Sequence, residues 1–326
     1  MGFKPKYTVI TGSMGDLGDR FLTTGYKEGV SLEDKLAAIS KIEGIAGVEL
    51  CFDPDGQEHD AAQMRKLLSE YRLAAPVVNA PMTSKKAWKF GTFSNRDRAI
   101  RQEAEKITKQ TMDFAESVGA GIVNLWMGQD GHDYSFQADY TEQWENMVTG
   151  IRACADYKPG MQLSLEFKPR EPRNRALLDT YATTLLMAQE IARANVGITI
   201  DNGHVFQIGA NMSQAVELCG RSKKLFNMHM NDNYGSWDDD MIVGSVRTVE
   251  YLELLYVLRK IDYSGWLSID IFPFREDAFK STEESIAVLE LCNNWVEKLG
   301  MKNIQSMIRE GDVTKVLKTI RTSLYK

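Results

Sequence analysis

The chain has 326 residues, of which 43% are apolar and 26% are charged, an ordinary composition for a globular protein. Its net charge of −6 argues against a nucleic-acid-binding surface, which would be basic. Its apolar runs fall far short of the ~20 residues that a membrane span needs, and its first residues lack the apolar stretch of a signal peptide. We therefore expect a cytoplasmic protein that contacts neither nucleic acid nor membrane, with its four well-separated cysteines reduced.

Eight short β-rich segments alternate with longer amphipathic segments along the chain. Strict alternation of strand and helix is typical of a parallel sheet, and eight such units in about 300 residues favour a (β/α)₈ barrel over a doubly wound sheet. The expected strands are residues 7–11, 47–52, 75–80, 121–126, 162–167, 196–201, 225–230 and 266–271. We expect an α/β fold, a (β/α)₈ TIM barrel over residues 1–300, with a short C-terminal helical extension over residues 301–326.

The fifth expected strand ends in the stretch SLEFKPREP, in which Glu166 and Lys168 alternate with the apolar residues Leu165 and Phe167. Side chains alternate between the two faces of a strand, and the active sites of barrels lie at the carboxyl ends of the strands. The apolar pair would therefore face the surrounding helices. Glu166 and Lys168 would face the mouth of the barrel.

The same alternation places a polar side chain inward at the ends of three later strands. Asp201 ends the sixth strand and Asp270 lies on the eighth, while His229 and Asn231 point inward from the seventh. Together with Glu166, three carboxylates and an imidazole would meet in one cavity, where the carboxylates repel one another unless a cation neutralises them. Oxygen and imidazole ligands suit Mn²⁺, Mg²⁺ or Co²⁺. A solvated strand end is the simpler interpretation for any one of these residues alone, but four in matching phase favour a metal site.

A second group of ionisable residues follows close to the first. His204 comes three residues after Asp201 in the motif DNGH, and the loop after the seventh strand carries SWDDDM. Asp238 and Asp240 are alternate residues, so both could point at one ion, with Asp201 shared between two metal sites. The alternative is an acidic, solvated loop beside a histidine that caps a helix.

Trp126 ends the fourth expected strand in the stretch NLWMGQDG. If the indole faces the barrel mouth, it forms a flat wall against the C–H face of a sugar. If it faces the helices, it is an ordinary core residue. The pattern alone favours neither orientation.

Together these motifs resemble the xylose isomerase-like barrels, and within them the metal-dependent ketol isomerases of the xylose and rhamnose type. SLEFKPREP is similar to their Glu-x-Lys-Pro-x-Glu-Pro motif, and DNGH to their acid-x-Gly-His motif. HMNDNYGSWDDDM resembles the His-x-Asn-Asp…Asp-Asp-Asp stretch of rhamnose isomerase. GTFSNRDRAIRQEA and DIFPFRED are similar to the segments after strands three and eight of xylose isomerase. The resemblance covers residues 44–277, and the combination is more specific than any one motif.

The resemblance implies a divalent-metal-dependent aldose–ketose isomerase that converts a free monosaccharide by a metal-assisted 1,2-hydride shift. It implies two ions per chain, Mn²⁺, Mg²⁺ or Co²⁺, and a homodimer or homotetramer. The catalytic residues that it implies are Lys168, Glu166 and Asp270, and the substrate-binding residues are Trp126, Lys168, His204 and Asn231. The implied metal ligands are Glu166, Asp201, His229 and Asp270 for one ion, and His204, Asp238 and Asp240 with the shared Asp201 for the other.

The chain departs from these isomerases after the second strand. They carry a histidine there that helps to open the sugar ring, whereas the stretch VELCFDPDG contains none. Assistance to ring opening would then fall to another group, such as Asp53 or Asp55.

Three related activities remain as alternatives. Related epimerases use an ene-diol route with one metal and a glutamate on each of strands five and eight; the shorter Asp270, Lys168 and the acidic triplet favour isomerisation here. Other related barrels are metal-binding subunits of C-glycoside-cleaving lyases. Endonuclease IV shares the architecture but uses three zinc ions and more histidines than the four in this chain.

Overall fold

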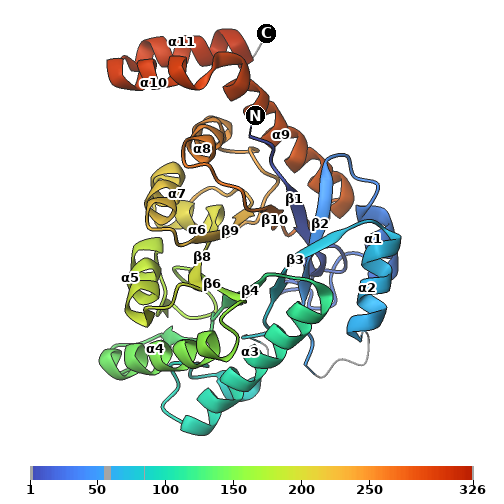
Figure 1. The fold of residues 1–326 in the computed structure, drawn as a ribbon, viewed down its shortest axis with the longest axis vertical. Helices are drawn as coiled ribbons and strands as arrows, with labels where there is room; N and C mark the ends of the chain where they lie inside the picture. The colour runs from blue at the N-terminus through green and yellow to red at the C-terminus, as the bar shows by residue number, and fades with distance from the viewer. Residues whose placement is uncertain (1–2, 55–59, 84, 325–326) are drawn as a thin grey trace.

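The barrel expected from the sequence is present and closed. In the computed structural model, which describes residues 3–54, 60–83 and 85–324, eight parallel strands pair in the order β1-β10-β9-β8-β6-β4-β3-β2. Figure 1 shows the strands at the centre with the helices around them. The strands are β1 (Tyr7–Ile10), β2 (Ile45–Cys51), β3 (Ala74–Asn79), β4 (Ile122–Trp126), β6 (Gln162–Glu166), β8 (Val196–Asp201), β9 (Leu225–Met230) and β10 (Leu267–Ile269). The eight expected strands and the (β/α)₈ architecture are confirmed, and the fifth to eighth expected strands correspond to β6, β8, β9 and β10.

The helices that cover the barrel follow the strands in turn. They are α1 (Leu32–Ile39), α2 (Ala61–Glu70), α3 (Arg98–Val118), α4 (Tyr140–Tyr157), α5 (Tyr181–Ile191), α6 (Asn202–Gln207), α7 (Met212–Arg221), α8 (Thr248–Lys260) and α9 (Ala278–Leu299). Two 3₁₀ turns, η1 (Thr11–Ser13) and η2 (Lys86–Trp88), lie after β1 and β3. Among the described residues, no helix combines the length and the apolar character needed to cross a membrane.

The C-terminal extension contains two helices, where the sequence predicted one. They are α10 (Met301–Glu310) and α11 (Val313–Leu324), and Figure 1 shows the pair beyond the end of α9. Gly300 and Gly311 adopt positive φ angles of 83° and 70°, which let the chain turn sharply before and after α10. These two turns divide the tail into separate helices.

A two-stranded sheet brings the loops after β4 and β6 together. Its antiparallel strands are β5 (Gly131–His132) and β7 (Arg175–Ala176). Gly131 has a φ of 148°, and a Cβ atom there would lie 2.1 Å from the Arg175 carbonyl oxygen. Glycine is therefore required at this approach, which fixes two mouth loops against each other.

The inside of the barrel contains a layer of polar side chains. Apolar residues such as Leu165, Ile200 and Met230 face the helices and are fully buried, as the alternation predicted. The inward positions below the mouth are polar, whereas barrel interiors are usually filled by branched apolar residues. We call this set the interior polar layer; it consists of Thr8, Glu49, Asn79, Asn124, Ser164, Thr199, Asn227 and Ser268, all buried except the half-buried Asn79.

Candidate metal centre and substrate site

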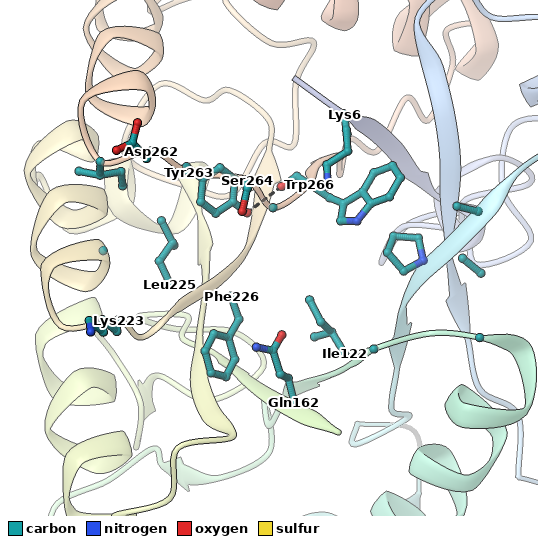
Figure 2. A pocket seen from close by; sticks show the side chains of 18 residues that line it. Lys6, Ile122, Gln162, Lys223, Leu225, Phe226, Asp262, Tyr263, Ser264 and Trp266 are labelled. Atoms are coloured by element: carbon teal, nitrogen blue, oxygen red, sulfur yellow. Dashed lines mark hydrogen bonds between the residues drawn. The ribbon is translucent and has the colours of Figure 1, made fainter. Parts of the chain in front are cut away.

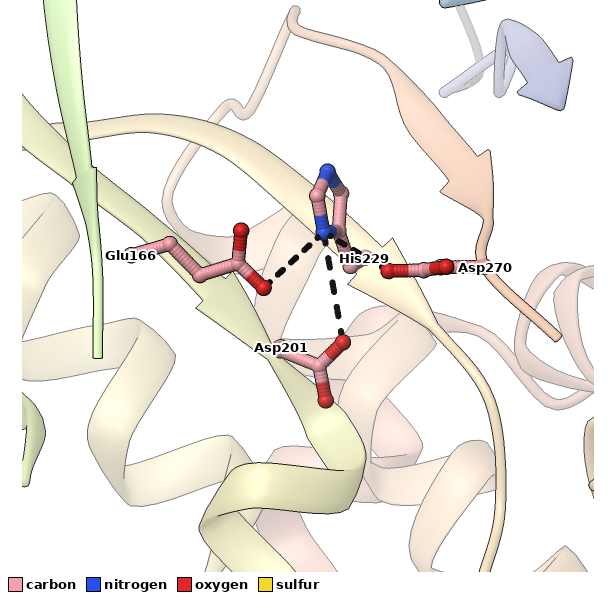
Figure 3. Close-up of side chains that lie close together, drawn as sticks. All are labelled: Glu166, Asp201, His229 and Asp270. Atoms are coloured by element: carbon pink, nitrogen blue, oxygen red, sulfur yellow. Dashed lines mark hydrogen bonds and ion pairs between the residues drawn. The ribbon is translucent and has the colours of Figure 1, made fainter. Parts of the chain in front are cut away.

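Four of the predicted ligands meet at the carboxyl ends of β6, β8, β9 and β10. Each of Glu166, Asp201, His229 and Asp270 offers one ligand atom, and these atoms lie within 4.8 Å of one another. His229 Nδ1 lies 3.1 Å from Asp270 Oδ2, 3.3 Å from Glu166 Oε1 and 4.0 Å from Asp201 Oδ2. Figure 3 shows the three carboxylates converging on this nitrogen. We call these four residues the first ligand group; their role as metal ligands stays a prediction.

Two of the three carboxylates in the first ligand group accept hydrogen bonds from buried amide side chains. Asn124 Nδ2 donates to Glu166 Oε2 at 2.7 Å, and Asn231 Nδ2 donates to Asp201 Oδ2 at 2.9 Å. Asp201 also caps α6, because its Oδ1 accepts the His204 backbone N–H at 3.0 Å. Asn231, predicted to bind substrate, is fully buried and contacts the Asp201 carboxylate; its role toward substrate stays a prediction.

The electrostatics of the first ligand group favour a bound cation. Burial and the charges of Asp238, Asp270 and Glu166 raise the pKa of Asp201 to about 7, against the opposing charge of His204. Burial alone would raise the pKa of Glu166 as well, but His229 lowers it to about 2. A cation that replaced the protons would relieve this concentration of negative charge.

A second ligand group forms where α6 meets the loop after β9. Ligand atoms of Asp201, His204 and Asp238 lie within 4.8 Å of one another. His204 Nε2 lies 3.0 Å from Asp238 Oδ2, while His204 Nδ1 lies 3.7 Å from Glu166 Oε1 and 3.8 Å from Asp201 Oδ1. Burial would lower the pKa of His204, but the charges of Asp201 and Asp238 raise it to about 9.

Unpartnered polar atoms give the second group the character of a cation site. His204 Nδ1, Asp238 Oδ1 and Asn231 Oδ1 are buried and have no hydrogen-bond partner in the described part of the chain. Buried polar atoms are nearly always paired, so three such atoms in one place need an explanation. Two oxygens and an imidazole nitrogen are donors that Mn²⁺, Co²⁺ or Mg²⁺ accept, and the residues present therefore fit a divalent ion.

Gly203 keeps the second ligand group compact. A Cβ atom at this position would lie 2.3 Å from Asn231 Oδ1 and 2.7 Å from Asp238 Oδ1. Any larger residue would push these two oxygens away. The glycine of the DNGH motif is thus explained by close approach.

Asp240 lies close to the ligand groups but belongs to neither. Burial and the charges of Asp238, Asp270 and Asp201 raise its pKa well above the usual range. The prediction depended on strand-like alternation through the triplet, whereas Asp240 has a left-handed φ of 45°. Its role as a metal ligand stays a prediction.

Lys168 lies at the edge of the second ligand group. Its Nζ is 2.8 Å from Asp238 Oδ2 and 2.7 Å from Glu171 Oε2. Burial would lower the pKa of Lys168, but the charges of Asp238 and Glu171 raise it above its usual range. The side chain therefore carries a permanent ammonium at the mouth of the barrel.

Trp126 faces the mouth and not the helices. Lys168 Nζ lies 5.0 Å from the centroid of its ring, and Trp126, Glu166 and Lys168 line a small cavity of about 10 Å³. The indole Nε1 is buried and has no partner among the described residues. The ambiguity left by the sequence pattern is resolved in favour of the mouth.

One buried carboxylate beneath the ligands was missed by the sequence analysis. Glu49 on β2 is fully buried, and its Oε2 lies 3.2 Å from His229 Nε2. The signal was present in the stretch GVELCF, because Val48 and Leu50 face outward and Glu49 between them must face inward. The two carboxylates proposed for ring opening gain no support: Asp55 lies outside the described residues, and Asp53 is exposed in the loop after β2.

A larger cavity lies at the opposite end of the barrel. It has a volume of about 570 Å³ and is lined at the starts of the strands by residues such as Lys6, Ile122, Gln162, Phe226 and Trp266 (Figure 2). No member of either ligand group lines it. Since the chemistry of these barrels takes place at the carboxyl ends of the strands, we assign this cavity no part in the reaction.

Comparison with known proteins agrees with this geometry. The family model for the xylose isomerase-like TIM barrel matches residues 36–292. A xylose isomerase from Thermus thermophilus is 26% identical over 230 residues, which are 69% of this chain and 59% of that protein. This chain thus spans less than two thirds of the length of that relative.

Solved structures of low sequence identity share the fold. An L-ribulose 3-epimerase superposes with a TM-score of 0.72 at 16% identity, covering 91% of this chain and 98% of its own. An AP endonuclease of family 2 from Brucella melitensis superposes with a TM-score of 0.67 at 16% identity, covering 85% of this chain and 96% of its own. Because the family model matches most of the sequence, this chain belongs to the xylose isomerase-like TIM barrel family.

Proposed function

We propose that this protein is a divalent-metal-dependent aldose–ketose isomerase that acts on a free monosaccharide. The observation that carries the proposal is the pair of ligand groups that share Asp201. In aldose–ketose conversion, O1 and O2 of the open-chain sugar exchange their roles as carbonyl and hydroxyl oxygen. Two adjacent cation sites could bind these two adjacent oxygens. The 26% identity to a protein named xylose isomerase adds support.

The side chains of this chain would each have a definite task. When bound, the divalent ions supply Lewis-acid polarisation of the sugar oxygens. Lys168, held by Asp238 and Glu171, would donate a hydrogen bond to the oxygen on which negative charge develops. Trp126 would shield that side of the site from water, and Glu166 stays ionised as an anionic ligand because its pKa is low.

Epimerisation through an ene-diol, with a single metal, is the second candidate. It is favoured by the positions of Glu166 and Asp270, whose carboxylates approach His229 Nδ1 from different strands at 3.3 and 3.1 Å. Epimerisation removes a proton from one face of a carbon and returns one to the other face, and two carboxylates near one ion could serve as the two bases. The second ligand group and Lys168 have no evident part in that route, so we rank it below isomerisation.

The two candidates differ in metal count and in the fate of one hydrogen. Chelated protein would be reconstituted with Mn²⁺, Co²⁺ or Mg²⁺, and elemental analysis would measure the bound metal. The reconstituted protein would then be screened against aldoses and ketoses in D₂O by NMR. Isomerisation by a hydride shift predicts two metals per chain and little deuterium at C1. One metal per chain and extensive deuterium incorporation would favour the epimerase, and full activity after chelation would contradict both.

Assembly into a homodimer or homotetramer is part of the proposal. It follows from the family resemblance and not from any contact between copies. Light scattering on the full chain would measure the mass in solution, and a monomer at micromolar concentration would remove this part alone.

A further inference from the structure

The interior polar layer is centred on Glu49, which belongs to neither ligand group. Four polar side chains surround its carboxylate, and three of them are donors. Asn227 Nδ2 donates to Oε1 at 2.7 Å and Asn79 Nδ2 to Oε2 at 3.1 Å. Ser268 Oγ also donates to Oε1, and His229 Nε2 lies 3.2 Å from Oε2. The carboxylate therefore has a full set of partners although none of its surface reaches solvent.

The contact with Glu49 determines which nitrogen of His229 carries the proton. Three side-chain donors, Asn227 Nδ2, Asn79 Nδ2 and Ser268 Oγ, already point at the Glu49 carboxylate, which is the arrangement that an ionised acceptor takes. An ionised carboxylate only accepts hydrogen bonds, and Nε2 must therefore be the donor. The other nitrogen, Nδ1, is then left to face Glu166 and Asp270.

Hydrogen bonds also connect the interior polar layer to Glu166, a second member of the first ligand group. Asn79 Oδ1 accepts from Asn124 Nδ2 at 2.9 Å, and the same Nδ2 donates to Glu166 Oε2 at 2.7 Å. Glu49 is thus connected to His229 directly and to Glu166 through two amides. Burying a carboxylate carries a desolvation cost, so a role for Glu49 in fold stability does not by itself explain its presence here.

We propose that Glu49 is a positioning residue for the first metal centre. Its hydrogen bond holds the imidazole of His229 in the tautomer and ring orientation that present Nδ1 to a divalent cation. This inference rests on the proposed metal dependence. It adds a residue that acts through a ligand and does not itself touch metal or sugar.

The first test is the affinity of the full-length protein for Mn²⁺ alone, measured by calorimetry. Glu49→Gln keeps the shape of the side chain but removes the charged acceptor, and we expect Mn²⁺ affinity to fall about 10–100-fold, as is usual for the loss of such a partner. The matched control is Asp130→Asn. Asp130 is also a buried carboxylate, but its partners are Thr92 and Ser94, so Mn²⁺ affinity should not change.

The second test asks whether Glu49 acts through His229. In a His229→Gln background, Glu49→Gln should have little further effect on Mn²⁺ affinity, since the imidazole that it orients is gone. The visible absorption spectrum of bound Co²⁺ should also change with Glu49→Gln and remain the same with Asp130→Asn. Additive effects of the two substitutions would contradict a positioning role.

The outcomes separate this inference from the proposed function. If the native protein binds no Mn²⁺, both fail. If it binds Mn²⁺ and Glu49→Gln lowers only the melting temperature, with Mn²⁺ affinity and Co²⁺ spectrum unchanged, Glu49 is merely structural. Should Glu49→Gln not fold, Ser268→Ala removes one donor to the same carboxylate; a few-fold loss of Mn²⁺ affinity is expected, and unchanged affinity would overturn the inference.

Discussion

The two ligand groups differ in how their residues are held. In the first, the ligands project from the ends of β6, β8, β9 and β10 and are supported by buried donors and acceptors such as Asn124 and Glu49. In the second, His204 comes from the short helix α6 and Asp238 from the loop after β9. Three polar atoms there are buried without partners among the described residues. The sheet fixes the side chains of the first ligand group, whereas buried polar atoms in the second group could still accept or donate a bond.

This difference indicates different tasks for the two groups. Ligands on strands with locked hydrogen bonds are preorganised, so the first ligand group should bind its ion more tightly. Ligands on a loop can adjust as a substrate arrives, at the expense of affinity. We expect titration with Mn²⁺ to show a tight step followed by a weaker one.

The largest effect should come from Asp201, because both ligand groups share it. Asp201→Asn keeps the size of the side chain and an oxygen that can cap α6, but it removes the shared anionic ligand. We expect loss of both ions by elemental analysis and loss of measurable isomerase activity. Retention of one tightly bound ion would mean that the two groups are less dependent on each other than the geometry indicates.

Substitution of Asp238 should affect the second ligand group and leave the first unchanged. Asp238→Asn removes an anionic ligand from the second ligand group only, so we expect one ion to remain and activity to fall by about 10³-fold or more, as for loss of a Lewis acid worth several kcal/mol. Asp239→Asn is the matched control, since Asp239 is a neighbouring carboxylate that belongs to neither ligand group and accepts the Tyr234 backbone N–H through its Oδ2.

Asp240 completes this series. The sequence predicted that it acts together with Asp238, but its carboxylate lies outside both ligand groups. We therefore expect Asp240→Asn to retain both ions, so that the double variant Asp238→Asn, Asp240→Asn loses no more metal than Asp238→Asn alone. Loss of the second ion in Asp240→Asn would restore the original assignment.

Lys168 should affect the rate and not the metal content. Lys168→Met removes the ammonium that would stabilise developing charge on the substrate, and kcat should fall by roughly 10²-fold or more. Both ions should remain, because Lys168 is not a ligand. Lys158→Met is a suitable control: that lysine pairs with Asp113 and Glu116 on the outer surface. Normal turnover in Lys168→Met would reduce Lys168 to an ion-pair partner of Glu171.

The first ligand group was predictable because it follows from strand periodicity. Once a segment is a buried strand, the period of two places Asp201 and His229 at the same end, and their register as neighbours on β8 and β9 agrees with this. The same rule, applied to β2, would have found Glu49; it was missed because only the strand ends were searched for ligands. Periodicity was sufficient for the four residues at the ends of β6, β8, β9 and β10.

The second ligand group was only partly predictable because it depends on loops. Asp240 adopts a left-handed conformation that no alternation anticipates, and Trp126 packs against Lys168, which comes from the loop after β6. The division of the tail into α10 and α11 depends on positive φ angles at Gly300 and Gly311. These are tertiary and turn-specific choices, which local propensity does not determine.

The smallest expected effect is a change in proton release with pH. A bound cation needs deprotonated ligands, so binding displaces any proton that the free site carries. The pKa of Asp201 is raised to about 7 and that of His204 to about 9, while that of Glu166 is lowered to about 2. His204 is therefore protonated at both pH 6 and pH 8, Glu166 at neither, and Asp201 mainly at pH 6. Binding of Mn²⁺ should then release about one more proton at pH 6 than at pH 8.

Calorimetry in buffers of different ionisation enthalpy measures the number of protons released directly. The sign follows from competition: acidification favours the protonated ligands, so the apparent affinity should fall as pH decreases, and fall more steeply below pH 7 than above it. Equal proton release at the two pH values would show that Asp201 is already ionised in the free protein.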